Sequence, residues 1–249
     1  MTETRDEAPS GIDALKDRLL DAVLVQVPFD GWSDAALRMA AQDVGVDVET
    51  ARALFPRGGV DLALAFHDRA DRQLAEELAA GSLAHLRYSE RIAHAVRRRL
   101  ELVAPHKEAV RRAAALFALP IHAVDGARAI WHTADVIWNG LGDRAEDYNW
   151  YTKRASLAGV ISATILYWLG DNSENSERTW AFLDRRIGEV MRVEEMKARL
   201  RRNPISRLAF AGPRAILSCI RPPHEGYWSG PWPRRWRRRR EERGPGGPD

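Results

Sequence analysis

His67, Asp68 and Asp71 bring an imidazole and two carboxylates within five positions, a grouping whose residue types can bind a metal ion. The spacing includes no Glu-x-x-His pair and no cysteine, which the common metal sites of helical proteins use. Because residues three or four apart lie on one face of a helix, we interpret these three as part of a solvated helical face.

The remaining residues give little support for catalysis. The chain has no Gly-rich phosphate loop after a strand and no convincing Ser-His-Asp or Cys-His arrangement. His122 and His132 lie among apolar and aromatic residues, where a lone histidine is usually a hydrogen-bonded core residue. A helical protein without a paired, buried acid and base rarely catalyses a reaction unaided. We therefore expect neither an enzyme nor a protein with a metal or other cofactor.

The composition fits a globular protein with a real core. Hydrophobic residues make up 45% of the 249 positions, and no stretch reaches the roughly 18 apolar residues that predict a membrane span. The single Cys219 excludes a disulfide framework. Residues 1–11 have neither the apolar run of a secretory signal nor the Arg-rich composition of a transit peptide. These features predict a cytoplasmic protein.

Charge is divided unevenly along the chain. Residues 197–249 contain 14 Lys or Arg and 4 Asp or Glu, a surplus of +10 that leaves −7 for residues 1–196. The natural partners of such a basic tail are anionic lipid headgroups or, as the alternative, nucleic acid. On a helical wheel of residues 205–221, the arginines fall in one sector and the apolar side chains lie opposite, which is typical of a helix at an anionic membrane surface. Gly212-Pro213 interrupts this segment, and a helix docked on the protein's own core is the alternative. The predicted membrane contacts are Arg207, Leu208, Phe210, Arg214, Ile216, Leu217 and Ile220.

Helical periodicity predicts the elements that position these residues. Helices are expected over residues 12–27, 33–44, 46–55, 60–80, 88–103, 105–119, 121–140, 148–169 and 179–191, with Pro28 and Gly31 ending the first. From residue 155 to 169 there is no charge, and apolar residues cover most of the circumference. This helix should therefore be enclosed on nearly every side. The arginines of residues 88–103 are expected to face water: Arg91, Arg97, Arg98 and Arg99.

Four short motifs resemble one protein family. Residues 147–154 read Asp-Tyr-Asn-Trp-Tyr-Thr-Lys-Arg, and they are accompanied by residues 142–143, 171–173 and 179–183. Together they resemble the TetR-like accessory protein of ubiquinone (coenzyme Q) biosynthesis, over about residues 12–196. That family binds isoprenoid lipid and works with the di-iron demethoxyubiquinone hydroxylase. The resemblance implies an all-α, TetR-like helical bundle with an N-terminal helix-turn-helix head, a C-terminal amphipathic helix and a homodimer contact through its last long helices.

The predicted organisation has five parts. Residues 1–10 form a disordered N-terminus, 11–60 a helix-turn-helix-like head, 61–196 a helical lipid-binding and dimerisation domain, 197–221 an amphipathic membrane-associating helix, and 222–249 a disordered Arg/Pro/Trp-rich tail. Asp43, Asp47 and Glu49 surround the would-be recognition helix and would be repelled by DNA phosphates. We expect a head retained for packing, without nucleic-acid binding. A TetR-type ligand-responsive transcriptional regulator is the alternative.

The resemblance also implies site residues. By position, the family's partner-binding patch matches Trp138, Asp147, Asn149, Trp150, Tyr151 and Arg154, for which helix capping and core packing are the alternative. The expected lipid contacts, which are plain core residues in the alternative, are Trp131, Leu157, Ile161 and Ile165. The expected function is non-enzymatic binding of an isoprenoid quinone precursor or phospholipid and its presentation to the hydroxylase. This would occur in the bacterial cytoplasm, at the inner membrane.

Overall fold

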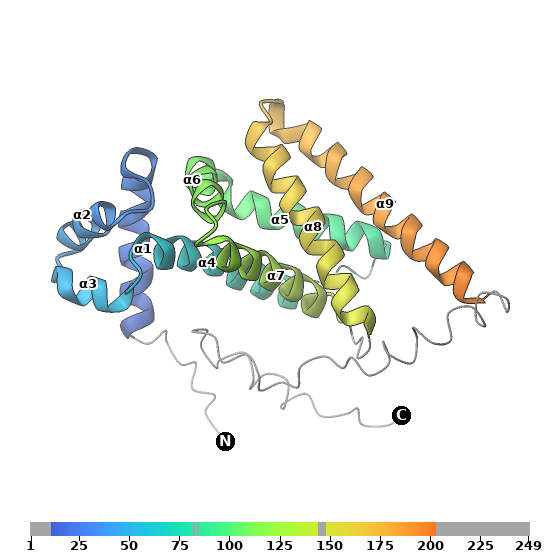
Figure 1. The fold of residues 1–249 in the computed structure, drawn as a ribbon, viewed down its shortest axis with the longest axis horizontal. Coiled ribbons are helices and arrows are strands. Elements are labelled where there is room, and N and C mark those ends of the chain that lie inside the picture. The colour runs from blue at the N-terminus through green and yellow to red at the C-terminus, as the bar shows by residue number, and fades with distance from the viewer. Residues whose placement is uncertain (1–10, 82, 84, 144–147, 203–249) are drawn as a thin grey trace, which may run out of the picture.

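The computed structural model describes residues 11–81, 83, 85–143 and 148–202, without the side chains of Tyr148, Asn149 and residues 193–202. Helices are the only regular secondary structure in these residues, which confirms the all-α prediction. Figure 1 shows a head of α1 to α3 at one end and a hairpin of the long helices α8 and α9 at the other. Residues 1–10 and 203–249 lie outside this description, and with them the predicted N-terminus, the predicted tail and most of the predicted membrane-associating helix. Residues 197–202, where that helix was expected to begin, continue α9 without a break.

The head consists of α1 (Gly11–Asp30), α2 (Asp34–Val44) and α3 (Val48–Leu54). Ser33 accepts a hydrogen bond from the Ala36 amide at the start of α2, and Asp47 caps α3 in the same way. The prediction that Pro28 helps to end the first helix was wrong. α1 continues to Asp30, and the Gly31 N–H still donates to the Val27 carbonyl at 2.9 Å; the chain leaves the helix at Gly31, whose φ is +67°.

The body begins with α4 (Gly59–Ala80) and α5 (Tyr88–Val103). A 3₁₀ turn (Ala104–His106) contains Pro105, and α6 (Lys107–Phe117) and α7 (Ala123–Gly140) follow. In Figure 1, α4 and α7 lie side by side, with α6 above the junction to the head. These four helices surround most of the space in which a ligand could bind.

α8 (Tyr148–Gly170) and α9 (Glu177–Arg202) complete the body as an antiparallel pair, with a second 3₁₀ turn (Glu174–Ser176) between them. Asp171 organises this corner. Its carboxylate accepts hydrogen bonds from the amide and hydroxyl of Thr179, at 2.9 and 2.6 Å, and from both donors of Ser173. These bonds hold the pKa of Asp171 well below its usual range. The motifs at residues 171–173 and 179–183 therefore contain the residues that fix the turn into α9.

The head is fastened to the body by a close contact. The indole N–H of Trp32 donates to the Ala109 carbonyl at 3.0 Å, and its ring lies 5.6 Å from that of Phe66. Gly59, at the start of α4, lies directly against the backbone of Trp32. A Cβ atom at position 59 would stand 2.0 Å from the Trp32 carbonyl oxygen, so only glycine fits there.

We predict that Gly59→Ala destabilises the protein by roughly 1–3 kcal/mol, because the clash involves backbone that cannot turn aside. Urea denaturation followed by circular dichroism measures the change. Gly188→Ala is the matched control, since a Cβ there meets no atom within 4 Å. That variant should gain about 0.5–1 kcal/mol from helix propensity. Equal stabilities for the two variants would contradict this account of the junction.

Candidate functional site

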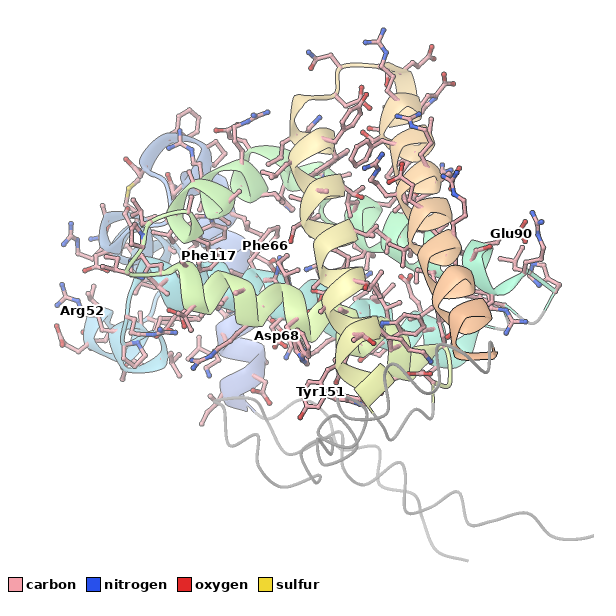
Figure 2. The ribbon with its side chains drawn as sticks, turned by 45° about the vertical axis from the view of Figure 1, so that its right-hand side comes forward. Arg52, Phe66, Asp68, Glu90, Phe117 and Tyr151 are labelled. Atoms are coloured by element: carbon pink, nitrogen blue, oxygen red, sulfur yellow. The ribbon has the colours of Figure 1, made fainter. Side chains whose placement is uncertain are left out.

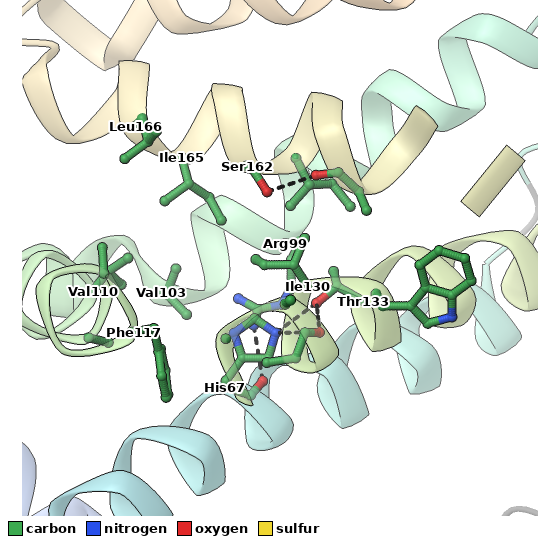
Figure 3. A pocket seen from close by; sticks show the side chains of 18 of the residues that line it. His67, Arg99, Val103, Val110, Phe117, Ile130, Thr133, Ser162, Ile165 and Leu166 are labelled. Atoms are coloured by element: carbon green, nitrogen blue, oxygen red, sulfur yellow. Dashed lines mark hydrogen bonds between the residues drawn. The ribbon is translucent and has the colours of Figure 1, made fainter. Parts of the chain in front are cut away.

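A cavity of about 540 Å³ lies between α4, α5, α6, α7 and α8. Figure 3 shows α8 passing over one side of it, with side chains from the other helices converging from below. Interiors of folded proteins rarely contain voids larger than a few water molecules. A space of this size falls in the range that binds a small organic ligand.

Most of the cavity wall is apolar. Phe117 of α6, Ile130 of α7 and Ile165 of α8 reach it from three helices (Figure 3). Figure 2 shows Phe66 and Phe117 near the centre of the molecule, whereas Arg52 lies on the outer side of the head. Gly126 allows α6 to approach α7, because a Cβ at that position would stand 2.6 Å from Cβ of Phe117.

Three of the four expected lipid contacts lie on this wall. Trp131, Ile161 and Ile165 line the cavity, while Leu157 is 4% exposed and packs in the hydrophobic core. The predicted spacing thus selected faces of α7 and α8 that border the cavity, and lipid contact there stays a prediction. Leu157 does not reach the cavity, because it belongs to the part of α8 that packs against its neighbours.

The mouth of the cavity lies along α8. Ala155 and Gly159 line the cavity and are exposed, and so is Leu166, at 66%. The prediction that this helix is enclosed on nearly every side was therefore wrong. An apolar sequence indicates a face that avoids water, but it does not distinguish contact with the same chain from contact with a ligand or a partner.

One wall of the cavity is polar and buried. Arg99 of α5 donates through Nε to Oδ1 of Asp71 at 2.6 Å and through Nη2 to the His67 carbonyl at 3.0 Å. Thr133 of α7 donates to the same carboxylate at 3.0 Å and lies 2.8 Å from Nε2 of His67. Arg99, Thr133 and His67 line the cavity, and Asp71, 1% exposed, lies behind them.

This wall corrects two predictions from the sequence. Asp71 and His67 do not belong to a solvated face, and Arg99, 6% exposed, does not face water. The sequence pattern predicted that Arg99 faces water. Instead, α5 packs Arg99 against α4, where its guanidinium neutralises the buried carboxylate of Asp71. Arg97 and Arg98 behave as ordinary surface residues, and they pair with Glu101 and Glu77.

Burial and charge set the protonation of the polar wall. Burial, with smaller contributions from Arg99 and His132, lowers the pKa of His67 to about 4, although Asp71 acts in the opposite direction. Burial is the largest single influence on Asp71 and would raise its pKa, but the charge and hydrogen bond of Arg99, together with His67 and His132, outweigh it, so the pKa is lowered. Burial raises the pKa of Asp68 to about 6 despite the nearby Arg72. At neutral pH, His67 is therefore uncharged and Asp71 is ionised.

No group of three candidate metal ligands occurs within the described residues. His67 makes hydrogen bonds within the polar wall. His122 and His132 are partly buried, at the residue preceding α7 and in its second half.

The expected partner-binding residues divide into buried and accessible ones. Arg154 is 1% exposed and donates to Asp135 of α7 at 2.6 Å, while its guanidinium lies 3.9 Å from the Trp150 ring centroid. Trp138 is also buried, at 6%. Both residues stabilise the junction of α7 and α8, as the packing alternative predicted. Trp150 and Tyr151 are partly exposed, and their rings meet edge to face with centroids 4.8 Å apart.

The remaining expected site residues lie beyond the description. Asp147 and the side chain of Asn149 are not described, and neither are the predicted membrane contacts between residues 207 and 220. Two contacts of this region were not anticipated from the sequence. Asn139 accepts a hydrogen bond from Arg154 at 3.3 Å, and Lys153 donates to Asp143 at 2.6 Å.

The arrangement of the helices is that of a TetR-like protein. A TetR transcriptional regulator from Nitrosomonas europaea ATCC 19718 superposes with a TM-score of 0.59 at 23% identity, over 71% of this chain and 98% of that chain. At this identity the likeness concerns the fold alone. It confirms the predicted bundle with its helix-turn-helix-like head.

Sequence comparison gives the family. The COQ9 family model matches residues 123–194, which extend from α7 into α9. "Ubiquinone biosynthesis protein COQ9, mitochondrial" of Drosophila melanogaster is 34% identical over 77% of this chain and 60% of its own length, and the Homo sapiens protein of that name is 31% identical over 73% and 59%. The chain belongs to the COQ9 family, which confirms the resemblance. It spans about three fifths of the length of these relatives.

Hydropathy limits how the described helices can meet a membrane. None of the helices in the described ranges is both long and apolar enough to cross a bilayer. α8 has the longest uncharged stretch, yet its polar first turns and its buried Arg154 keep it below that limit.

The low pKa of His67 predicts a pH-dependent stability. The unfolded chain binds a proton near pH 6.5 and the folded protein only near pH 4, so the contribution of His67 is intact above pH 6.5 and is lost as the pH falls towards 4. Relative to His67→Gln, the wild type should therefore lose on the order of 3 kcal/mol across this window.

Urea denaturation of both proteins at several pH values between 7.5 and 4 measures this difference. Asp68 has the opposite pH dependence, because its pKa is raised, but it is present in both proteins and cancels in the comparison. The other charged groups around His67, namely Asp71, Arg99 and His132, are likewise unchanged. Stability curves that run parallel over the whole range would contradict a buried, neutral His67.

Proposed function

We propose that this protein is a non-enzymatic, lipid-binding accessory protein of ubiquinone biosynthesis. It binds an isoprenoid quinone precursor, or a phospholipid, in the cavity between α4 and α8 and delivers the precursor to the demethoxyubiquinone hydroxylase. The observation that carries this proposal is the apolar cavity of about 540 Å³, open along α8. The names of the curated relatives support the pathway.

The physical benefit of such a carrier is the shielding of an apolar chain. Leaving a hydrocarbon in water costs about 0.8 kcal/mol per CH₂ group, so a polyprenyl lipid does not leave a bilayer unaided. Ile161, Ile165 and Phe117 offer an apolar surface in exchange. The volume suits a ligand of moderate size, so a long polyprenyl chain extends out of the mouth beside Leu166.

A row of neighbouring aromatic rings connects the cavity with the proposed docking patch for the hydroxylase. Trp131 lines the cavity, and its ring centroid lies 6.2 Å from that of Trp150. Trp150 in turn contacts Tyr151 and Arg154. In this proposal, Trp150 and Tyr151 meet the enzyme, while Trp138 and Arg154 hold them in place from below. Asp147 and Asn149 belong to the same patch by sequence.

The charge of the C-terminal part supports a proposed cellular setting. In this proposal, the basic segment after residue 197 contacts an anionic bilayer through its arginines, at the cytoplasmic side of a bacterial inner membrane. The exposed Tyr167 of α8, together with α9, forms the contact between two copies of the chain.

Transcriptional regulation receives less support from the head. Asp47 caps α3, and Glu49 in its first turn pairs with Arg52. A helix that begins with two carboxylates opposes the phosphate contacts on which DNA affinity depends. The head therefore serves packing, through its contact between Trp32 and α6.

Closing the mouth of the cavity should remove the ligand. A Cβ at Gly159 meets nothing within 4 Å, so Gly159→Phe folds and fills the space between α7 and α8. We predict that mass spectrometry of organic extracts finds an isoprenoid quinone, its precursor or a phospholipid on the wild-type protein. The amount should fall at least severalfold in the variant.

Gly188→Phe is the matched control, because Gly188 in α9 has the same open space around it and does not line the cavity. It should retain the ligand. A wild-type protein that is folded but carries no lipid, even after incubation with membranes, would rule out the carrier function.

The docking patch can be tested by affinity capture of the demethoxyubiquinone hydroxylase. Trp150→Ala should reduce the captured enzyme roughly tenfold or more, because partly exposed tryptophans dominate many interfaces. Phe29→Ala in α1, an aromatic side chain of the head that is 79% exposed, is the control and should leave capture unchanged. Equal capture by both variants would remove Trp150 from the interface.

A further inference from the structure

The cavity contains a polar wall that the binding of a plain hydrocarbon chain does not require. His67, Arg99 and Thr133 line it, with Asp71 behind them, opposite the apolar face of α8 (Figure 3). The hydroxyl of Ser162, on α8, is already bonded to the Ala158 carbonyl at 2.9 Å. Buried polar groups cost stability unless they are paired. A cavity that held only hydrocarbon could be lined by apolar side chains alone, without this cost.

The polar wall has no net charge. Arg99 and Asp71 form a buried ion pair at 2.6 Å, in which one charge cancels the other. His67 is neutral at physiological pH, since burial lowers its pKa to about 4. An anionic headgroup would therefore enter a low-dielectric space without a free cation to meet it.

The hydrogen bonds already made within the polar wall determine which donors and acceptors remain for a ligand. Within the part of the chain that the structure describes, Arg99 uses one N–H towards Asp71 and one towards the His67 carbonyl, out of five donors. Nε2 of His67 lies 3.1 Å from the Ala129 carbonyl, which only accepts, so Nε2 carries the proton. In the neutral ring, Nδ1 is then an acceptor. The wall thus presents guanidinium donors beside an imidazole acceptor.

We infer that the polar wall binds a neutral, oxygen-bearing group of an apolar ligand, such as a carbonyl or a hydroxyl, through hydrogen bonds from Arg99. This inference rests on the proposed function and specifies its ligand. The oxygen-bearing end lies against α4, α5 and α7, and the hydrocarbon chain runs to the mouth beside Gly159. The oxygen-bearing end of the ligand is then sheltered from water for as long as the ligand is bound. The protein must therefore release the ligand in order to deliver it.

Three isoprenoid probes of matched chain length test this inference: farnesylacetone, the hydrocarbon with a methylene in place of its carbonyl, and farnesyl diphosphate. Displacement of the fluorescent dye N-phenyl-1-naphthylamine from the full-length protein measures the affinity of each probe. The ketone should bind about tenfold more tightly than the hydrocarbon, the gain of one hydrogen bond from a charged donor. The diphosphate should show no advantage over the hydrocarbon.

The double variant Asp71→Asn/Arg99→Met removes the guanidinium together with its counter-charge, so that no buried charge is left unpaired. It should abolish the advantage of the ketone and leave the affinity for the hydrocarbon unchanged. If this variant does not fold, the infrared band of ¹³C-labelled ketone on the wild-type protein decides. That band should lie at lower wavenumber than in hexane, as expected for a hydrogen-bonded carbonyl.

Each other outcome overturns a specific statement. Equal affinities for ketone and hydrocarbon, or an unshifted carbonyl band, would overturn the polar recognition and leave the carrier function standing. Tightest binding of the diphosphate, lost in the double variant, would show that the site recognises an anion and would overturn the neutral ligand. If neither the ketone nor the hydrocarbon displaces the dye, the cavity does not bind isoprenoids and the proposed function fails as well.

Discussion

The buried ion pair between Asp71 and Arg99 is the interaction on which the body of this protein depends. It joins α4 to α5, and Thr133 extends it to α7, so three of the helices around the cavity meet at one carboxylate. Taking two charges out of water is costly, and the loss of either partner would leave the other uncompensated. The position of the polar wall is therefore fixed by electrostatics, whereas the opposite side of the cavity is shaped by the size of its side chains.

Small residues create the space that the ion pair bounds. Ala113, Ala114 and Ala127 line the cavity from α6 and α7, and Gly159 does so from α8. In an ordinary interior these positions would carry larger side chains that fill the gap between helices. The large side chains of Phe117 and Trp131 border the space without filling it. The combination of a rigid polar wall and an adaptable apolar face is typical of sites that bind a ligand with a polar group and a hydrocarbon chain.

Periodicity and capping residues predicted the helices well, because both are local. Ser33 and Gly45 flank α2 where a helix over 33–44 was expected, whereas α3 begins at Val48, two residues after its expected start. The polar wall could not be predicted in this way, since a charged residue on a helix such as Arg99 is solvated in most proteins. Its burial depends on the packing of α5 against α4, which no local pattern contains. The only signal of a polar wall in the sequence was Thr133, a polar residue on an otherwise apolar face of α7, and it was not part of the prediction.

The central claim is that an isoprenoid occupies the cavity between α4 and α8. Photochemical labelling of the full-length protein with a diazirine-bearing farnesyl ketone, followed by mass spectrometry of its peptides, tests this claim most directly. The structure predicts adducts in residues 110–131 and 155–168, suppressed by an excess of unlabelled farnesylacetone. Adducts that lie only in the head, or that an excess of unlabelled ketone does not suppress, would contradict it.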